Sequence, residues 1–142
     1  MAIIQTLTTS FKVELAQGLH NFTAGTGNVF KMALYTANAD LGASTTAYTA
    51  AGESSGTNYS AGGIVLTNIT PAFQGTTAYW TFDTATFTNV TLTANGALIY
   101  NSTNGNRSVA VLNFGVNITK SSQNLVVTFP AADATNAVLR IA

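Results

Sequence analysis

The sequence contains no cysteine, so disulfide bonds, zinc–thiolate sites, iron–sulfur clusters and cysteine nucleophiles are all excluded. Charge is scarce as well: five Lys and Arg balance five Asp and Glu, and together they make up 7% of the chain, where about 25% is usual. A neutral chain with scattered basic residues has no electrostatic footprint for nucleic acid and no polybasic patch for an anionic membrane. We therefore expect neither nucleic acid nor a membrane among its partners.

Long hydrophobic runs are missing too. No apolar stretch approaches the roughly 20 residues that a transmembrane helix needs. Residues 1–10 carry no basic residue, and their apolar run is too short for a secretory signal. We therefore expect the chain to be made in the cytoplasm and to be soluble.

What the chain does have is a length of 142 residues and a hydrophobic content of 46%, enough for one domain with a real core. Its polar surface must consist mostly of Thr, Asn and Ser, which lose less on desolvation than ions do. Because a surface without net charge favours association, this composition predicts a protein that packs against copies of itself or a partner. The alternative is an ordinary β-domain with a neutral surface.

One segment has the period of a helix. Phe11, Leu15 and Leu19 recur at i, i+4 and i+8, which places them in one stripe. The segment 10–18 begins with Ser10, which can cap a helix, and ends with a glycine, which suits a C-terminus. We predict a helix here, although alternation at positions 11, 13 and 15 leaves a strand as the alternative.

The rest of the chain, after Asn28, has the pattern of β-structure. Large apolar side chains alternate in 29–36, which predicts a half-buried strand. Residues 38–63 are rich in small and polar residues and predict a long loop, with a short strand near Tyr48 or Tyr59 as the alternative. Pro71 is expected to end a strand at 64–70. Further strands are predicted at 78–83, 85–91, 97–101, 108–114, 125–129 and 137–141.

The Asn104-Gly105 step is a strong hairpin signal between two of these strands. Roughly seven to nine short strands at about ten-residue spacing predict a mainly β fold. We expect an antiparallel β-sandwich of Ig-like or jelly-roll type with one short N-terminal helix. The whole chain, 1–142, is expected to form one domain, with an N-terminal helical segment at 1–27 and the loop excursion at 38–63.

No constellation of residues indicates catalysis. His20 is the only histidine, and as a general base it would need an orienting carboxylate, of which Glu14 is the nearest in sequence. We interpret His20 as a helix-end side chain that bonds to backbone or solvent. The five carboxylates are far apart in sequence, and no nucleophile elbow, phosphate loop, dinucleotide fingerprint or zinc-protease motif is present. We predict neither an enzyme nor a cofactor.

Residues 101–106 imitate the oxygen spacing of a calcium loop, but they include no carboxylate. We interpret them as a turn and predict no metal site.

The aromatic residues offer the remaining candidates for binding. Trp80 and Phe82 share one face of a predicted strand, which is typical of a sandwich core. If Trp80 were instead exposed beside Tyr79, the pair would form a platform for stacking sugar rings. Tyr48 and Tyr59, in the long excursion, are better candidates for an exposed contact surface.

Several phrases of this sequence resemble a known group of proteins. They are FKVEL at 11–15, GLHNF at 18–22, KMALY at 31–35, LGASTTAY at 41–48, SGTNYSAGG at 55–63, GALIYN at 96–101 and VAVLNFG at 109–115. These phrases are similar to small virion proteins of tailed bacteriophages, and the similarity runs over nearly the whole chain. None of them is a catalytic signature.

The resemblance implies a structural protein of the phage particle, and above all a capsid decoration (cement) protein that binds and stabilises the head lattice. It implies the major capsid protein and copies of this chain as partners, in a homo-oligomer such as a trimer, on the capsid surface of the virion. Two alternatives stay open: a tail, baseplate or head-fibre component, and a carbohydrate-binding module for host adhesion.

A cement protein needs broad uncharged surfaces that symmetry repeats many times. The candidate contact residues are therefore the stripe of Phe11, Leu15 and Leu19 together with Tyr48 and Tyr59 of the excursion. The alternative for the stripe is that it packs on its own sandwich.

Overall fold

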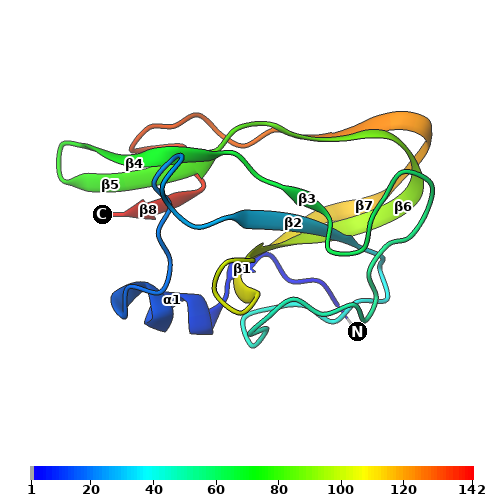
Figure 1. Ribbon diagram of the computed structural model, residues 1–142, viewed down its shortest axis with the longest axis horizontal. Coiled ribbons are helices and arrows are strands. Elements are labelled where there is room, and N and C mark those ends of the chain that lie inside the picture. Colours follow the sequence, from blue (N-terminus) through cyan, green and yellow to red (C-terminus); the bar gives the residue numbers. More distant parts are fainter. Residues whose placement is uncertain (1) are drawn as a thin grey trace.

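The computed structural model describes residues 2–142 and contains two antiparallel sheets with one short helix beneath them (Figure 1). The elements are β1 (Thr6–Leu7), α1 (Thr9–Ala16), β2 (Phe30–Tyr35), β3 (Ile64–Val65), β4 (Asn68–Gln74), β5 (Thr77–Phe82), β6 (Ala85–Asn101), β7 (Arg107–Val127) and β8 (Leu139–Ile141). One sheet has the order β1-β7-β6-β2-β3, and the other has the order β4-β5-β8. The predicted β-sandwich with one N-terminal helix is confirmed.

The hairpin of β6 and β7 dominates the fold. It was predicted as four short strands, but 85–91 and 97–101 belong to one strand, and most of 108–114 and 125–129 belongs to its partner. Register shifts interrupt the ladder near Val90 and between Ala94 and Gly96, and the hairpin bends there (Figure 1). Its lower arm (96–101 with 107–113) lies in the five-stranded sheet, and its upper arm (85–94 with 118–127) folds over the core.

The turn of this hairpin lies at the predicted Asn-Gly step. The backbone N–H of Arg107 donates to the carbonyl of Asn104 at 3.3 Å. Gly105 and Asn106, between them, have φ values of 64° and 56°. Glycine and asparagine adopt this left-handed backbone at little cost, and the chain reverses here within the loop 102–106, between the paired residues Asn101 and Arg107.

Strand β2 is covered on both faces, whereas the sequence predicted a half-buried strand. Phe30, Met32 and Leu34 point into the main core between the sheets. Ala33 and Tyr35 point the other way into a second cluster, which the excursion 38–63 covers with Leu41 and other side chains. The excursion makes isolated bridges but no strand of its own, and it runs beneath the sheet before rising to β3 (Figure 1).

The helix is confirmed over 9–16, but its N-cap lies two residues before the predicted cap. Thr8, not Ser10, is the N-cap, and its hydroxyl oxygen accepts the N–H of Phe11 at 3.4 Å. Gly18 follows the helix with φ 73°, a left-handed conformation that only glycine adopts readily. In residues 2–142, no helix is long and apolar enough to cross a membrane.

Pro71 does not end a strand, contrary to the prediction. It lies inside β4, between Ile69 and Ala72, where the register with β5 shifts. Because β4 is at the edge of its sheet, and because a bulge leaves a residue unpaired, the missing N–H of proline costs no ladder bond there.

Candidate functional site

Two clusters of titratable side chains lie inside the fold, and the first surrounds His20. The His20 ring is buried, with Nε2 3.0 Å from Glu14 Oε1 and Nδ1 3.1 Å from Asn101 Nδ2. Since the Asn101 amide nitrogen can only donate, Nδ1 accepts, and Nε2 carries the hydrogen that is donated to Glu14. The second carboxylate oxygen of Glu14 accepts from Arg107 at 2.8 Å.

Both ring nitrogens of His20 and both carboxylate oxygens of Glu14 are therefore occupied by other side chains. The ring of His20 also stacks on Phe30 and meets Phe11 edge to face, with centroids 6.2 and 5.0 Å apart. Our interpretation of His20 as bonded to backbone or solvent was wrong, because two side chains, Glu14 and Asn101, take both of its nitrogens. The arrangement joins the helix end to the turn of the β6–β7 hairpin.

Asn101 extends this junction through its own amide. Its Nδ2 also donates to Asn28 Oδ1 at 2.9 Å, and its Oδ1 accepts the backbone N–H of Thr103 and Asn104. Asn104 Nδ2 donates to the carbonyl of Leu19 at 2.6 Å. The predicted turn at 101–106 thus uses its oxygens and amides to hold the segment that follows the helix.

The second cluster surrounds Glu53 and is called the tyrosine cluster here; its tyrosines are Tyr35, Tyr48, Tyr59 and Tyr100. Glu53 accepts hydrogen bonds from the hydroxyls of Tyr48 and Tyr59, each at 2.6 Å, and from the N–H of Gly62 at 2.8 Å. The Tyr59 hydroxyl in turn accepts the N–H of Leu34 at 2.9 Å. These bonds fasten the excursion to β2.

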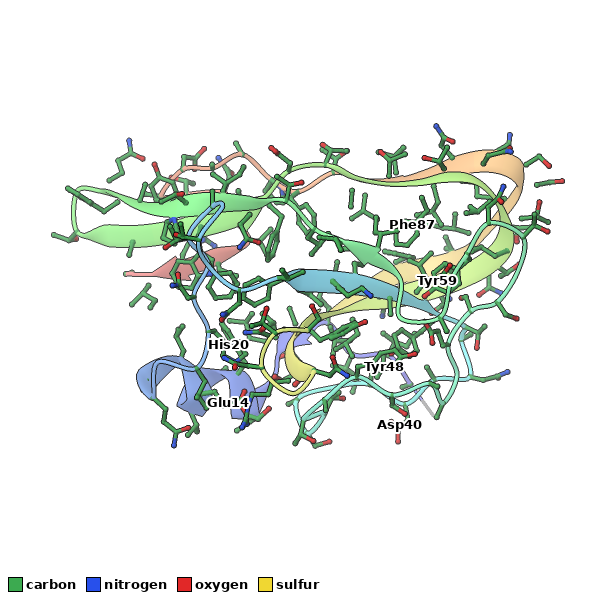
Figure 2. All side chains as sticks on the ribbon, viewed as in Figure 1. Glu14, His20, Asp40, Tyr48, Tyr59 and Phe87 are labelled. Carbon is green, nitrogen blue, oxygen red and sulfur yellow. The ribbon has the colours of Figure 1, made fainter. Side chains whose placement is uncertain are left out.

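Stacking supports the same contacts. Tyr48 stacks on Tyr100 with centroids 5.0 Å apart, and Tyr59 stacks on Phe87 at 6.0 Å. Figure 2 shows Tyr59 between Phe87 above and Tyr48 below, so that the excursion bridges the upper arm and the underside of the sheet. Asp40, at the bottom of the same view, points away from the cluster.

The environment raises the pKa of all four tyrosines. Burial is the main cause, and the neighbouring Glu53 carboxylate adds to it because a second negative charge there is unfavourable. The hydrogen bond to Glu53 is the second cause for Tyr48, whose pKa rises to about 12. The protonated hydroxyls are therefore part of the folded structure.

The five predicted contact residues do not form one surface. Phe11 is 1% exposed and lies in the main core, as the alternative for the stripe expects. Leu15 and Leu19 are half-buried, and Leu15 packs against the core from outside. Tyr48 and Tyr59 are also half-buried and belong to the tyrosine cluster.

Trp80 is 6% exposed and packs in the core with Phe82. The ring centroids of Trp80 and Phe22 are 5.5 Å apart. The prediction that this strand turns Trp80 and Phe82 inward is confirmed. A flat sugar-stacking platform on Trp80 is therefore not formed in this structure. Asn68 Oδ1, Trp80 Nε1 and Thr81 Oγ1 are buried without a hydrogen-bond partner in residues 2–142.

The outer face of the upper arm consists almost entirely of hydroxyl and amide side chains. The exposed residues there are Thr86, Thr88, Asn89, Thr91, Thr119, Ser121, Ser122, Gln123 and Asn124, with Val126 among them. Large apolar side chains are also exposed elsewhere, Phe73 most of all at 78%. Within residues 2–142, no group of three or more His, Asp or Glu side chains is placed to bind a metal ion.

Sequence reasoning missed both clusters as units. Glu14 and His20 are six residues apart. Glu14 lies on the buried side of the helix, and His20 follows the helix end, so this pair could have been predicted from the sequence. Arg107 and Asn101 come from the distant hairpin, and no local pattern points to them.

Comparison with protein-family models, with curated proteins and with solved structures finds no match to this chain.

Proposed function

We propose that this chain is a structural protein of a bacteriophage particle, and specifically a capsid decoration protein that binds the head lattice and stabilises it. The observation that carries the proposal is the outer face of the upper arm, a broad strip of Thr, Ser, Asn and Gln side chains without an acidic residue. Such side chains are cheaper to desolvate than ions, so a strip of this kind suits a contact that a lattice repeats many times.

The use of the titratable groups supports a structural role as well. His20 and Glu14 join the helix to the hairpin turn, and Glu53 holds the excursion to β2. In these positions they rigidify the domain, and a rigid domain loses little conformational entropy when it binds. A decoration protein gains from this, because each of its contacts can then be weak and still add up over the lattice.

A second candidate is a tail, baseplate or head-fibre component, for which a rigid β-sandwich is equally suitable. The carbohydrate-binding alternative is less favoured, because the Trp80 side chain packs in the core and the hydroxyls of Tyr48 and Tyr59 are engaged by Glu53.

The test is to add the purified chain to phage capsids that were prepared without it. We expect saturable binding, a copy number set by the lattice, and capsids that resist heat or chelator better than bare ones. Cryo-electron microscopy of the complex should place copies regularly over the head. Copies found only on the tail or at a single vertex would refute the decoration role in favour of the second candidate, and no binding to any part of the particle would refute both.

A further inference from the structure

One side of the sandwich is left open. Beyond its short pairing with β1 at Ala110 and Val111, strand β7 has no strand partner on the side opposite β6 within residues 2–142. Strand β8 likewise pairs only with β5. The N–H and C=O groups along such edges are available to an added strand.

Three hollows accompany these open edges, the first with a mixed polar and apolar lining and the other two mainly apolar. Two of them, of about 410 and 310 Å³, share Leu7 and Arg140 and lie between β1, α1 and β8. A third, of about 290 Å³, lies along β7 where the two arms of the hairpin face each other. Six partly buried apolar side chains of the core line the hollows: Leu7, Leu15, Phe114, Ile118, Val127 and Val138.

The charged side chains that line these hollows are all cationic. Lys12 and Arg140 line the hollows beside β8, and Lys120 lines the one along β7. No aspartate or glutamate side chain lines any of the three. Asp133, outside the hollows, accepts the N–H groups of Thr135 and Asn136, and its charge interacts with that of Arg140.

We propose that this open side, called the β7–β8 groove, binds an extended segment of a partner protein that carries apolar side chains and carboxylates. The inference rests on the proposed function, in which that partner is the major capsid protein. Apolar side chains of the segment fill the hollows, and its carboxylates meet Lys12, Lys120 and Arg140 at the rim. A second copy of the same groove is a poor occupant, because a two-fold contact would bring these cations together.

The bulges of β7 fit this interpretation. Gly115 and Ser122 have positive φ, at 80° and 51°, and mark register shifts on either side of Lys120. Bulges and an edge lysine discourage indiscriminate strand pairing. The groove thus excludes most strands and admits one whose charges complement its own.

A matched pair of substitutions tests the groove. Ile141, which is 54% exposed and lines one of the hollows beside β8, is changed to aspartate, and so is Val65, which is 61% exposed on β3 at the other edge of the five-stranded sheet. Binding of each variant to capsids prepared without this chain is measured at low salt. We expect Ile141→Asp to weaken binding about tenfold or more, because it sets a carboxylate against those of the partner. Val65→Asp should bind within about twofold of the wild type.

A second measurement examines the cations. The triple variant Lys12→Gln, Lys120→Gln and Arg140→Gln should weaken binding at low salt, and its difference from the wild type should shrink as salt is raised. The control triple Ala24→Glu, Ser44→Glu and Ser55→Glu changes the net charge by the same amount on exposed side chains outside the groove. We expect the control to bind like the wild type.

The outcomes separate the two proposals. If the wild type binds capsids and both Ile141→Asp and the cation triple bind equally well, the groove proposal is wrong and the decoration role stands. If the wild type does not bind capsids, both fail. If Ile141→Asp instead dissociates a homo-oligomer, as light scattering would detect, the occupant is a second copy and the inference about an acidic partner is overturned.

Discussion

Removing a single hydroxyl from the tyrosine cluster should show how strongly the excursion is held. In Tyr59→Phe, Glu53 loses a hydrogen bond of 2.6 Å, and the N–H of Leu34 loses its acceptor at 2.9 Å. A hydrogen bond to a charged group contributes about 1.5–3 kcal/mol, and a buried donor without a partner costs about 1–3 kcal/mol. Because Tyr59 is only half-buried and water can replace part of this, we expect a loss of about 3 kcal/mol in the free energy of unfolding.

Tyr48→Phe is the matched control. Its hydroxyl also donates to Glu53 at 2.6 Å, but no backbone group depends on it, and its ring keeps the stack on Tyr100. Its removal should cost about 1 kcal/mol, less than the range for a bond to a charged group, because Tyr48 is half-buried and water can replace part of the bond. The difference of about 2 kcal/mol between the two variants is the contribution of the buried Leu34 N–H.

Urea denaturation followed by circular dichroism measures both variants. With a slope of about 2 kcal/mol per molar urea, the midpoint should fall by about 1.5 M for Tyr59→Phe and about 0.5 M for Tyr48→Phe. Tyr79→Phe, outside the cluster, should leave the midpoint where it is. Equal shifts for Tyr59→Phe and Tyr48→Phe would refute the role assigned to the Leu34 N–H, and no shift in either would refute the cluster as a fastener.

Three further predictions concern the two clusters and the backbone. Because the cluster tyrosines have raised pKa values, their stabilisation is complete below pH 10 and is lost as pH rises toward about 12, so urea midpoints should fall steadily over that range. Asn101→Ala, which leaves several buried groups unpaired, should lower the free energy of unfolding by about 4 kcal/mol, and Asn104→Ala should lower it by about 1 kcal/mol. Equal losses in the two variants would contradict the central position of Asn101 in this hydrogen-bond network. Gly75→Ala, at φ 60° in open space, should cost about 1 kcal/mol, whereas Gly63→Ala, whose Cβ would sit 1.7 Å from a carbonyl oxygen, should lower thermal stability far more or prevent folding.

The sequence predicted the class of fold well because alternation and turn residues are local signals. It divided the long hairpin into four strands because the bulges carry polar residues and glycine, as at Asn89, Gly115 and Ser122. A pattern of alternation stops at such a residue, although the chain continues in the same ladder. The length of a bulged strand is therefore hidden from a reading that depends on period alone.

Contacts between distant segments were the other limit. Ala33 and Tyr35 alternate with the core residues Met32 and Leu34, as the residues of an exposed face would. Only the later excursion buries them. The candidate contact residues met the same difficulty. The helical period places Phe11 in one apolar stripe with Leu15 and Leu19. Whether such a stripe faces its own core or a partner depends on strands more than 60 residues away.

The scarcity of charge makes the position of each charged side chain informative. Among the acids, Glu14 and Glu53 are used inside the fold, and Arg107 is drawn to Glu14. In an ordinary domain, surface charges of both signs are interspersed and screen one another. Here Lys12, Lys120 and Arg140 line hollows that no acidic side chain lines, so positive side chains predominate there, although Asp133 interacts with Arg140 from outside the hollows. A partner that approaches the open side therefore meets apolar walls and positive charge together, and that combination selects carboxylates next to apolar side chains.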